Sequence, residues 1–123
     1  MRYIAVFLIG FVAAAPAAAQ NMPVSTFLEK ADKLRAKGPF ALFSSDLRVL
    51  KREVESAAIV YRAESKADAA AGKPKDTCPP DKIKLGSDEL LNSFRSIPAD
   101  LRPRTSVKQA WAAFLKRKYP CPK

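Results

Sequence analysis

The segment that decides the fold runs from Ser44 to Ala71 and reads SSDLRVLKREVESAAIVYRAESKADAAA. It opens with two serines and Asp46, a composition typical of a helix N-cap followed by a carboxylate in the first turn. Apolar residues then recur at spacings of three and four, and a second set lies nearly opposite the first. The first set is Leu47, Leu50, Val54, Ala58 and Tyr61, and the second is Val49 and Val60. A helix that is apolar on two sides is usually surrounded by other elements, so we predict a long central helix whose last turns, beyond Tyr61, project into solvent.

A first amphipathic helix is predicted before Gly38-Pro39, a pair that ends helices. Thr26 and Glu29 have the T-x-x-E spacing of a capping box. The residues that share one helical face are Val24, Phe27, Leu28, Ala31 and Leu34.

The link between these two helices is apolar and reads Phe40-Ala41-Leu42-Phe43. We expect its side chains to fold back over the two helices and join the core. The alternative is an exposed docking loop, because exposed apolar patches mark interfaces.

Residues 72–80 read GKPKDTCPP and form a predicted linker, because proline removes backbone donors and fixes backbone angles. Two shorter helices follow. Residues 87–89 cap the first of them and Pro98 stops it, while the S-x-x-Q pattern from Ser106 to Gln109 opens the second. Their inward residues are Leu90, Leu91, Phe94 and Ile97 in the first, and Val107, Ala110, Trp111, Phe114 and Leu115 in the second. We expect an antiparallel hairpin and, since no strand pattern competes, an all-α domain of four helices.

The N-terminus differs from the rest of the chain. Arg2 precedes an apolar run, and small residues follow it up to Ala19. This pattern predicts a cleaved secretory signal peptide over residues 1–19 and a single helical domain over residues 20–123. The alternative, a retained anchor, is disfavoured because the run is about half of the roughly 20 residues that a spanning helix needs.

Cys78 and Cys121 are the only cysteines. An even count in an exported chain predicts a disulfide, because the compartment is oxidising. Reactive thiols or metal ligands are the alternative, but two sulfurs without histidine make a poor zinc site.

Catalytic groups are scarce in this chain of 123 residues, which contains no His, no G-x-S-x-G motif and no phosphate-binding loop. Glu64 and Asp68 lie four residues apart, but Arg62 and Lys66 are interleaved with them, a pattern typical of a solvated helix face. We therefore expect no enzymatic activity, no metal site and no cofactor.

Positive charge is the most prominent feature of the composition, with 22 Lys and Arg against 12 Asp and Glu, a net charge of +10. Nucleic acid is a common partner of basic proteins, but an exported protein rarely meets it, and helix-turn-helix, RNP and finger signatures are absent. Acidic exported proteins, the anionic outer leaflet and cell-wall polymers are the expected partners, and a purely solubilising surface is the alternative. Arg102, Arg104 and Lys108, at a proline-rich turn, are the predicted partner-binding residues, because guanidinium groups suit carboxylates.

The C-terminal half resembles a known family. The residues that carry the resemblance are Cys78-Pro79-Pro80, the helix with Leu90-Leu91 and Phe94, then Ile97-Pro98, the helix with Ala110-Trp111 and Phe114-Leu115, and Tyr119-Pro120-Cys121. Together they are similar to the Rap/Tai immunity proteins of Gram-negative bacteria. The resemblance implies a small, helical, disulfide-bonded periplasmic protein that binds and blocks a peptidoglycan amidase delivered by type VI secretion. In the earlier half, the long helix has Val60-Tyr61 in place of that family's Gly-Tyr pair and lacks its further cysteine.

Two classes of function follow. The first is a periplasmic or secreted protein binder without stable membrane insertion, of which an amidase inhibitor is the concrete case. The second is a general envelope factor, such as a small helical chaperone or a structural protein, without a dedicated toxin partner. The sequence leaves the oligomeric state open.

Overall fold

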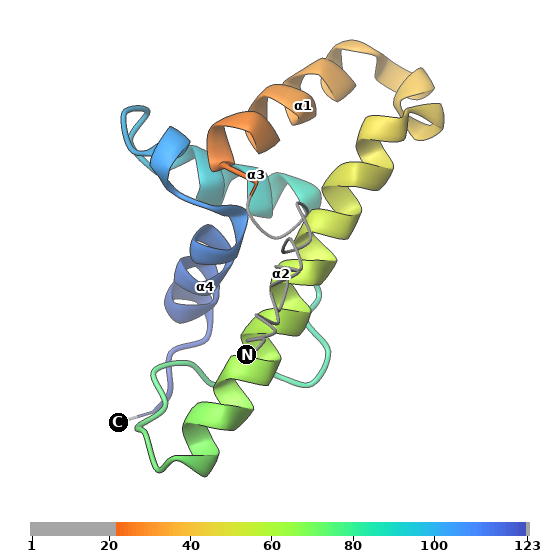
Figure 1. Cartoon of the computed structure of the whole chain (residues 1–123). Helices are drawn as coiled ribbons and strands as arrows, with labels where there is room; N and C mark the ends of the chain where they lie inside the picture. Colours follow the sequence, from red (N-terminus) through yellow and green to blue (C-terminus); the bar gives the residue numbers. More distant parts are fainter. Residues whose placement is uncertain (1–21, 123) are drawn as a thin grey trace, which may run out of the picture.

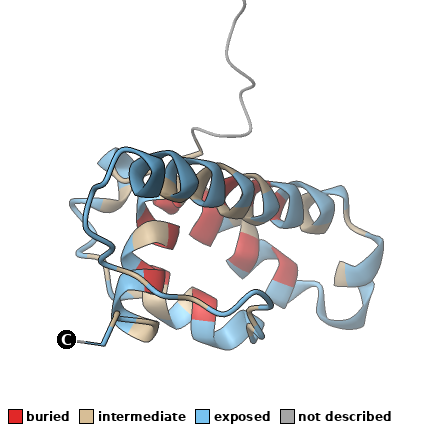
Figure 2. Cartoon of the chain, turned by 90° about the horizontal axis from the view of Figure 1, so that it is seen from below, coloured by how far each residue is buried: buried red, intermediate tan, exposed pale blue. Residues whose placement is uncertain are grey.

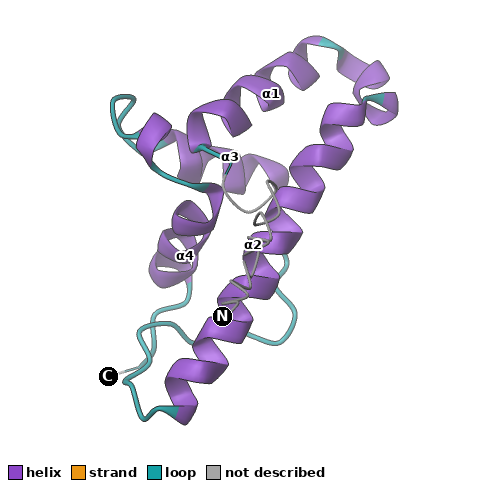
Figure 3. Cartoon of the chain, viewed as in Figure 1, coloured by secondary structure: helices purple, strands orange, loops and turns teal. Residues whose placement is uncertain are grey.

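The structure, a computed structural model, describes residues 22–122 and is built from helices (Figure 3). Its elements are α1 (Val24–Ala36), the 3-10 helix η2 (Gly38–Phe43), α2 (Ser45–Ala70), α3 (Ser87–Arg95), the 3-10 helix η3 (Arg102–Arg104) and α4 (Val107–Lys118). No strand occurs within the described range; two isolated bridges pair Pro23 with Ser106 and Thr77 with Pro120. The predicted all-α fold is confirmed, while the predicted signal peptide over residues 1–19 lies outside the described residues.

The long helix α2 organises the domain, because it packs against α1, η2 and α4. In Figure 1, α1 and α2 meet at η2, α4 runs beside the later part of α2, and α3 lies across the molecule behind them. Figure 2 shows α2 from the side, with its buried residues turned toward the other helices and its outer face exposed. The second apolar set predicted for α2 is not buried, because Val49 is exposed and Val60 is half-buried. The neighbouring Ile59 is also exposed, so α2 buries one main face and not two.

The core collects the apolar stripes of all four α-helices. Its members are Val24, Phe27, Leu28, Ala31, Leu34, Leu50, Ala57, Leu90, Phe94, Val107, Ala110, Trp111, Phe114 and Leu115. Phe27 meets Phe94 edge to face, with ring centroids 5.2 Å apart. All five residues predicted to point inward from α4 are buried, which confirms that Trp111 belongs to the core.

The predicted helix caps are right for α2 and α4 and wrong for α1 and α3. Helix α3 begins at Ser87 itself, after Gly86, and has no side-chain cap. Ser44 caps α2, and Ser106 forms a reciprocal capping box with Gln109. Helix α1 begins two residues before Thr26 and has no side-chain cap. The amide of Val24 instead donates to the carbonyl of Thr105, at 2.8 Å, so the start of α1 is fixed by a distant segment.

The predicted disulfide between Cys78 and Cys121 is confirmed. The Thr77–Pro120 bridge adjoins it, and the amide of Cys78 donates to the carbonyl of Tyr119 at 2.8 Å. Residues 72–80 are irregular, as predicted for a linker. The disulfide therefore joins this linker to the segment that follows α4.

Helices α3 and α4 are joined through η3 and pack against each other, as the expected hairpin requires. Lys118, the last residue of α4, forms an ion pair with Glu89 in the first turn of α3, with 2.6 Å between nitrogen and oxygen. Arg117 donates to the hydroxyls of Ser93 and Ser96, in and just after the second half of α3. The last turn of α4 therefore contacts both ends of α3, and the two helices cross at an angle instead of lying strictly antiparallel (Figure 1).

Within residues 22–122, no helix combines the length and the apolar character that crossing a bilayer requires.

Candidate functional site

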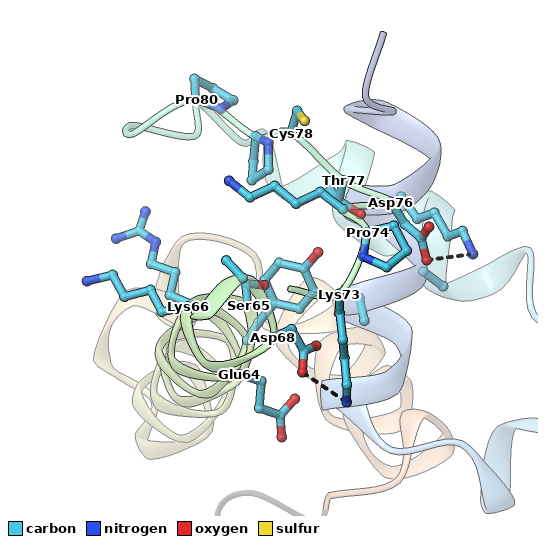
Figure 4. A pocket seen from close by; sticks show the side chains of 18 of the residues that line it. Glu64, Ser65, Lys66, Asp68, Lys73, Pro74, Asp76, Thr77, Cys78 and Pro80 are labelled. Atoms are coloured by element: carbon cyan, nitrogen blue, oxygen red, sulfur yellow. Dashed lines mark ion pairs between the residues drawn. The ribbon is translucent and has the colours of Figure 1, made fainter. Parts of the chain in front are cut away.

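A polar cleft of about 790 Å³ lies at the disulfide end of the domain. Its walls come from the C-terminal part of α2, residues 73–81 and the outer side of α4 (Figure 4). Figure 4 draws Asp68 paired with Lys73, with 3.5 Å between oxygen and nitrogen, and Asp76 paired with Lys116 of α4 at 3.7 Å.

Three of the four carboxylate residues that line this cleft are paired with lysines, and the fourth is Asp81. Glu64 forms an ion pair with Lys108, Asp68 with Lys73, and Asp76 with Lys116. The prediction that Glu64 and Asp68 lie on a solvated helix face agrees with this arrangement, because each carboxylate is paired with a different cation. A general acid and base need two groups held in different protonation states around one substrate atom, and these paired, exposed carboxylates do not provide that geometry.

A second concavity, the apolar groove, lies between α1, α2 and α3 and encloses about 710 Å³. Its apolar lining consists of Phe27, Ala31, Leu34, Ala41, Leu47, Leu50, Val54, Leu90 and Leu91. Charged residues stand at its edge, where Arg35 of α1 and Asp88 of α3 form an ion pair with 2.7 Å between nitrogen and oxygen. An apolar lining with a few charged groups at the rim is typical of sites that bind apolar ligands or helical segments of partners.

No family model, no curated protein and no solved structure matches this chain.

The apolar side chains of η2 form an exposed tip beside the groove, defined here as Phe40, Leu42 and Phe43. Their exposed fractions are 74%, 76% and 86%. The expectation that they fold back over α1 and α2 is wrong, and the alternative of an exposed apolar loop agrees with the structure. The six-residue connection turns the chain directly from α1 into the Ser44 cap of α2, so within it Gly38 and Ala41 line the groove while the three large apolar side chains do not.

The three predicted partner-binding residues do not form one free cluster. Arg102 is half-buried, and its guanidinium donates to the carbonyls of Ile97 and Arg95 at 2.8 and 2.7 Å. It therefore satisfies carbonyl groups at the C-terminal end of α3. Lys108 is bound to Glu64, whereas Arg104 is exposed and makes no side-chain hydrogen bond or ion pair with the described residues. The guanidinium of Arg102 is therefore engaged within the domain, in contrast to its predicted role in binding a partner's carboxylate.

Glu53 is the polar residue that the sequence patterns missed. It is 2% exposed, and its Oε1 accepts from the amide of Met22 at 3.2 Å. Burial raises the pKa of the Glu53 carboxyl above its ordinary value, and the hydrogen bond from Met22 partly opposes this rise. The available signal was its position three residues after Leu50 and four before Ala57, which places it on the buried face of α2.

Replacement of Glu53 by Gln is expected to stabilise the domain near neutral pH by on the order of 1 kcal/mol, because it removes a buried charge and keeps an oxygen that accepts from Met22. The folded-state pKa of Glu53 is raised, so the stabilisation that its protonation provides is present below the unfolded-state pKa and is lost as pH rises through the folded-state pKa. The advantage of the variant should therefore grow with pH across that window.

Urea unfolding of both proteins between pH 4 and 8 measures this difference, with the exposed Glu55→Gln as the matched control. The prediction would be contradicted if Glu53→Gln were less stable than the wild type at neutral pH and if the difference did not change with pH. The charge of Glu53 would then not destabilise the folded domain.

Proposed function

We propose that this chain is an exported binding protein and that the apolar groove receives a segment of another exported protein. The observation that carries the proposal is the groove itself, an open concavity of about 710 Å³ lined by leucine, phenylalanine, valine and alanine side chains from three helices. Five of the nine apolar side chains are at most 7% exposed, and the other four, Ala41, Leu47, Val54 and Leu91, are half-buried. An apolar concavity with charged groups at its rim is typical of a binding site.

The groove suits an amphipathic helix. Apolar anchors spaced along one helix face can fill its floor, while polar groups of the same helix meet Arg35, Lys51, Glu55 and Asp88 at the edge. The floor includes residues of the packed core, among them Phe27, Leu34 and Leu50, so it is held in place before binding, which limits the entropy that binding costs.

The concrete case is an immunity-type inhibitor of a peptidoglycan amidase effector in the Gram-negative periplasm. Its support is the resemblance of residues 78–121 to Rap/Tai proteins, together with a disulfide between the two cysteines of that stretch. A disulfide is typical of exported proteins, because reducing compartments keep thiols free. The proposed role is binding rather than catalysis, because three of the four carboxylates of the polar cleft are paired with separate lysines.

Replacement of Ala41 by Arg tests the groove. Ala41 is half-buried in the groove lining, so a long charged side chain there obstructs the groove and leaves the core residues in place. We expect Ala41→Arg to weaken partner binding at least tenfold, about 1.4 kcal/mol. The matched control is Ala63→Arg, which adds the same side chain at an exposed position of α2 outside the groove.

The measurement is a pull-down from periplasmic extract with oxidised protein covering residues 20–123, followed by titration of the captured protein against each variant. A partner captured equally by the wild type and by Ala41→Arg would place binding elsewhere. Capture of many unrelated envelope proteins, unaffected by either variant, would favour the alternative of a general envelope factor.

A further inference from the structure

The tip formed by Phe40, Leu42 and Phe43 stands apart from the groove floor and from the core. It lies where α1 and α2 meet, at one end of the molecule (Figure 1). Three large apolar side chains, each about three-quarters exposed or more, occur there within four residues. Scattered apolar residues are normal on a protein surface, but a contiguous apolar group at a protruding end is typical of an interaction site.

Cations flank this tip on both sides in the sequence. Residues 33–52 contain six Lys and Arg and one acidic residue, a net charge of +5. The six are Lys33, Arg35, Lys37, Arg48, Lys51 and Arg52; all are exposed, and Arg35 alone among them forms an ion pair with a described residue, Asp88 of α3. The single acid, Asp46, is already paired with Lys30, at 3.3 Å between nitrogen and oxygen. The partner that this end fits must therefore accept apolar side chains and supply negative charge around them.

We propose that the tip docks on an anionic phospholipid bilayer, with Phe40, Leu42 and Phe43 in the interfacial region and the flanking cations against the headgroups. Aromatic and leucine side chains partition into the boundary between headgroups and acyl chains, and basic residues near the surface add attraction to anionic lipids. The docking is peripheral, because no helix in the described part of the chain is suited to cross the bilayer. It goes beyond the proposed groove function, since it uses a different set of side chains.

A second copy of the chain fits the tip less well than a bilayer does. Every copy carries the same cluster of cations and a formal charge of +10, so contact between two tips would bring like charges together. An acidic protein surface could match the charge, but a bilayer matches both the charge and the convex shape of a single protruding turn.

The apolar part of the proposal is tested by replacing Phe40 and Phe43 together with Ser. Vesicle sedimentation would use oxidised protein covering residues 20–123, which retains every described residue, with phosphatidylglycerol–phosphatidylcholine vesicles and with pure phosphatidylcholine vesicles. We expect wild-type partitioning to be at least tenfold stronger on the anionic vesicles and to fall at least tenfold in the double variant. The matched control is Ile59→Ser, which removes an apolar side chain that is 68% exposed on α2 but distant in sequence from the tip, and it should bind within twofold of the wild type.

The charge part is tested with Lys37→Gln combined with Arg48→Gln, against Lys73→Gln combined with Lys75→Gln in the linker. The first pair should reduce partitioning at least threefold, and the linker pair should leave it within experimental error. Phe43→Trp adds a reporter, since the only natural tryptophan, Trp111, is buried, and its added emission should shift to shorter wavelength on anionic vesicles.

Three results would overturn the proposal. They are equal partitioning on neutral and anionic vesicles, wild-type binding by the Phe40→Ser and Phe43→Ser double variant, and unshifted emission of Phe43→Trp in vesicle-bound protein. Loss of a wild-type dimer in the double variant, without vesicle binding by either protein, would instead assign the tip to self-association.

Discussion

Removal of the Cys78–Cys121 disulfide is expected to lower the free energy of unfolding by about 4 kcal/mol, the value that chain-entropy arithmetic gives for a loop of this size. The two cysteines are 43 residues apart in the sequence, so the bond restricts much of the unfolded chain. A domain of this size typically has about 5 to 15 kcal/mol of stability in total, and losing 4 kcal/mol removes a large share of it.

The measurement compares urea unfolding of the wild type with that of the Cys78→Ser and Cys121→Ser double variant. Dithiothreitol should lower the stability of the wild type to that of the variant and leave the variant unchanged, which controls for effects of the reductant. A difference below about 1 kcal/mol would mean that the unfolded chain is already compact between these residues, and it would contradict the stabilising role assigned to the disulfide.

Replacement of Phe94 by Ala is expected to cost about 3 to 5 kcal/mol, because it removes a fully buried ring and leaves a cavity. Phe94 packs edge to face against Phe27 of α1, so the substitution also removes this aromatic contact between α3 and α1. The matched control is the same change at Phe43, which is 86% exposed and should alter stability by less than about 0.5 kcal/mol.

Thermal and urea unfolding of the two variants measure the difference directly. Equal losses for Phe94→Ala and Phe43→Ala would mean that the tip is part of the core. That result would contradict both the packing described here and the exposed tip.

The sequence predicted the features that depend on neighbouring residues. Ser106 caps α4 because Gln109, three residues later, returns its hydrogen bond, and this pattern is readable in four letters. The inward face of α4 follows from helical spacing alone. The disulfide was predictable because only two cysteines are present and the composition indicated export.

The failures arise where distant segments decide the local structure. Thr26 and Glu29 have the spacing of a cap, but α1 starts earlier because the carbonyl of Thr105 accepts from Val24. Phe40 and Phe43 look like core residues in the sequence, and only the three-dimensional turn at η2 shows that they point outward. Arg102 looked free because nothing in its neighbourhood predicted that Arg95 and Ile97 would supply acceptors.

The central claim is that the apolar groove is the binding surface of this protein, and hydrogen exchange tests it most directly. The oxidised domain would be compared alone and in complex with the partner captured from periplasmic extract. We predict slowed exchange in α1, η2, the first half of α2 and α3, which together line the groove. Slowed exchange confined to the end of α2 and residues 73–81, with the groove segments unchanged, would contradict the account.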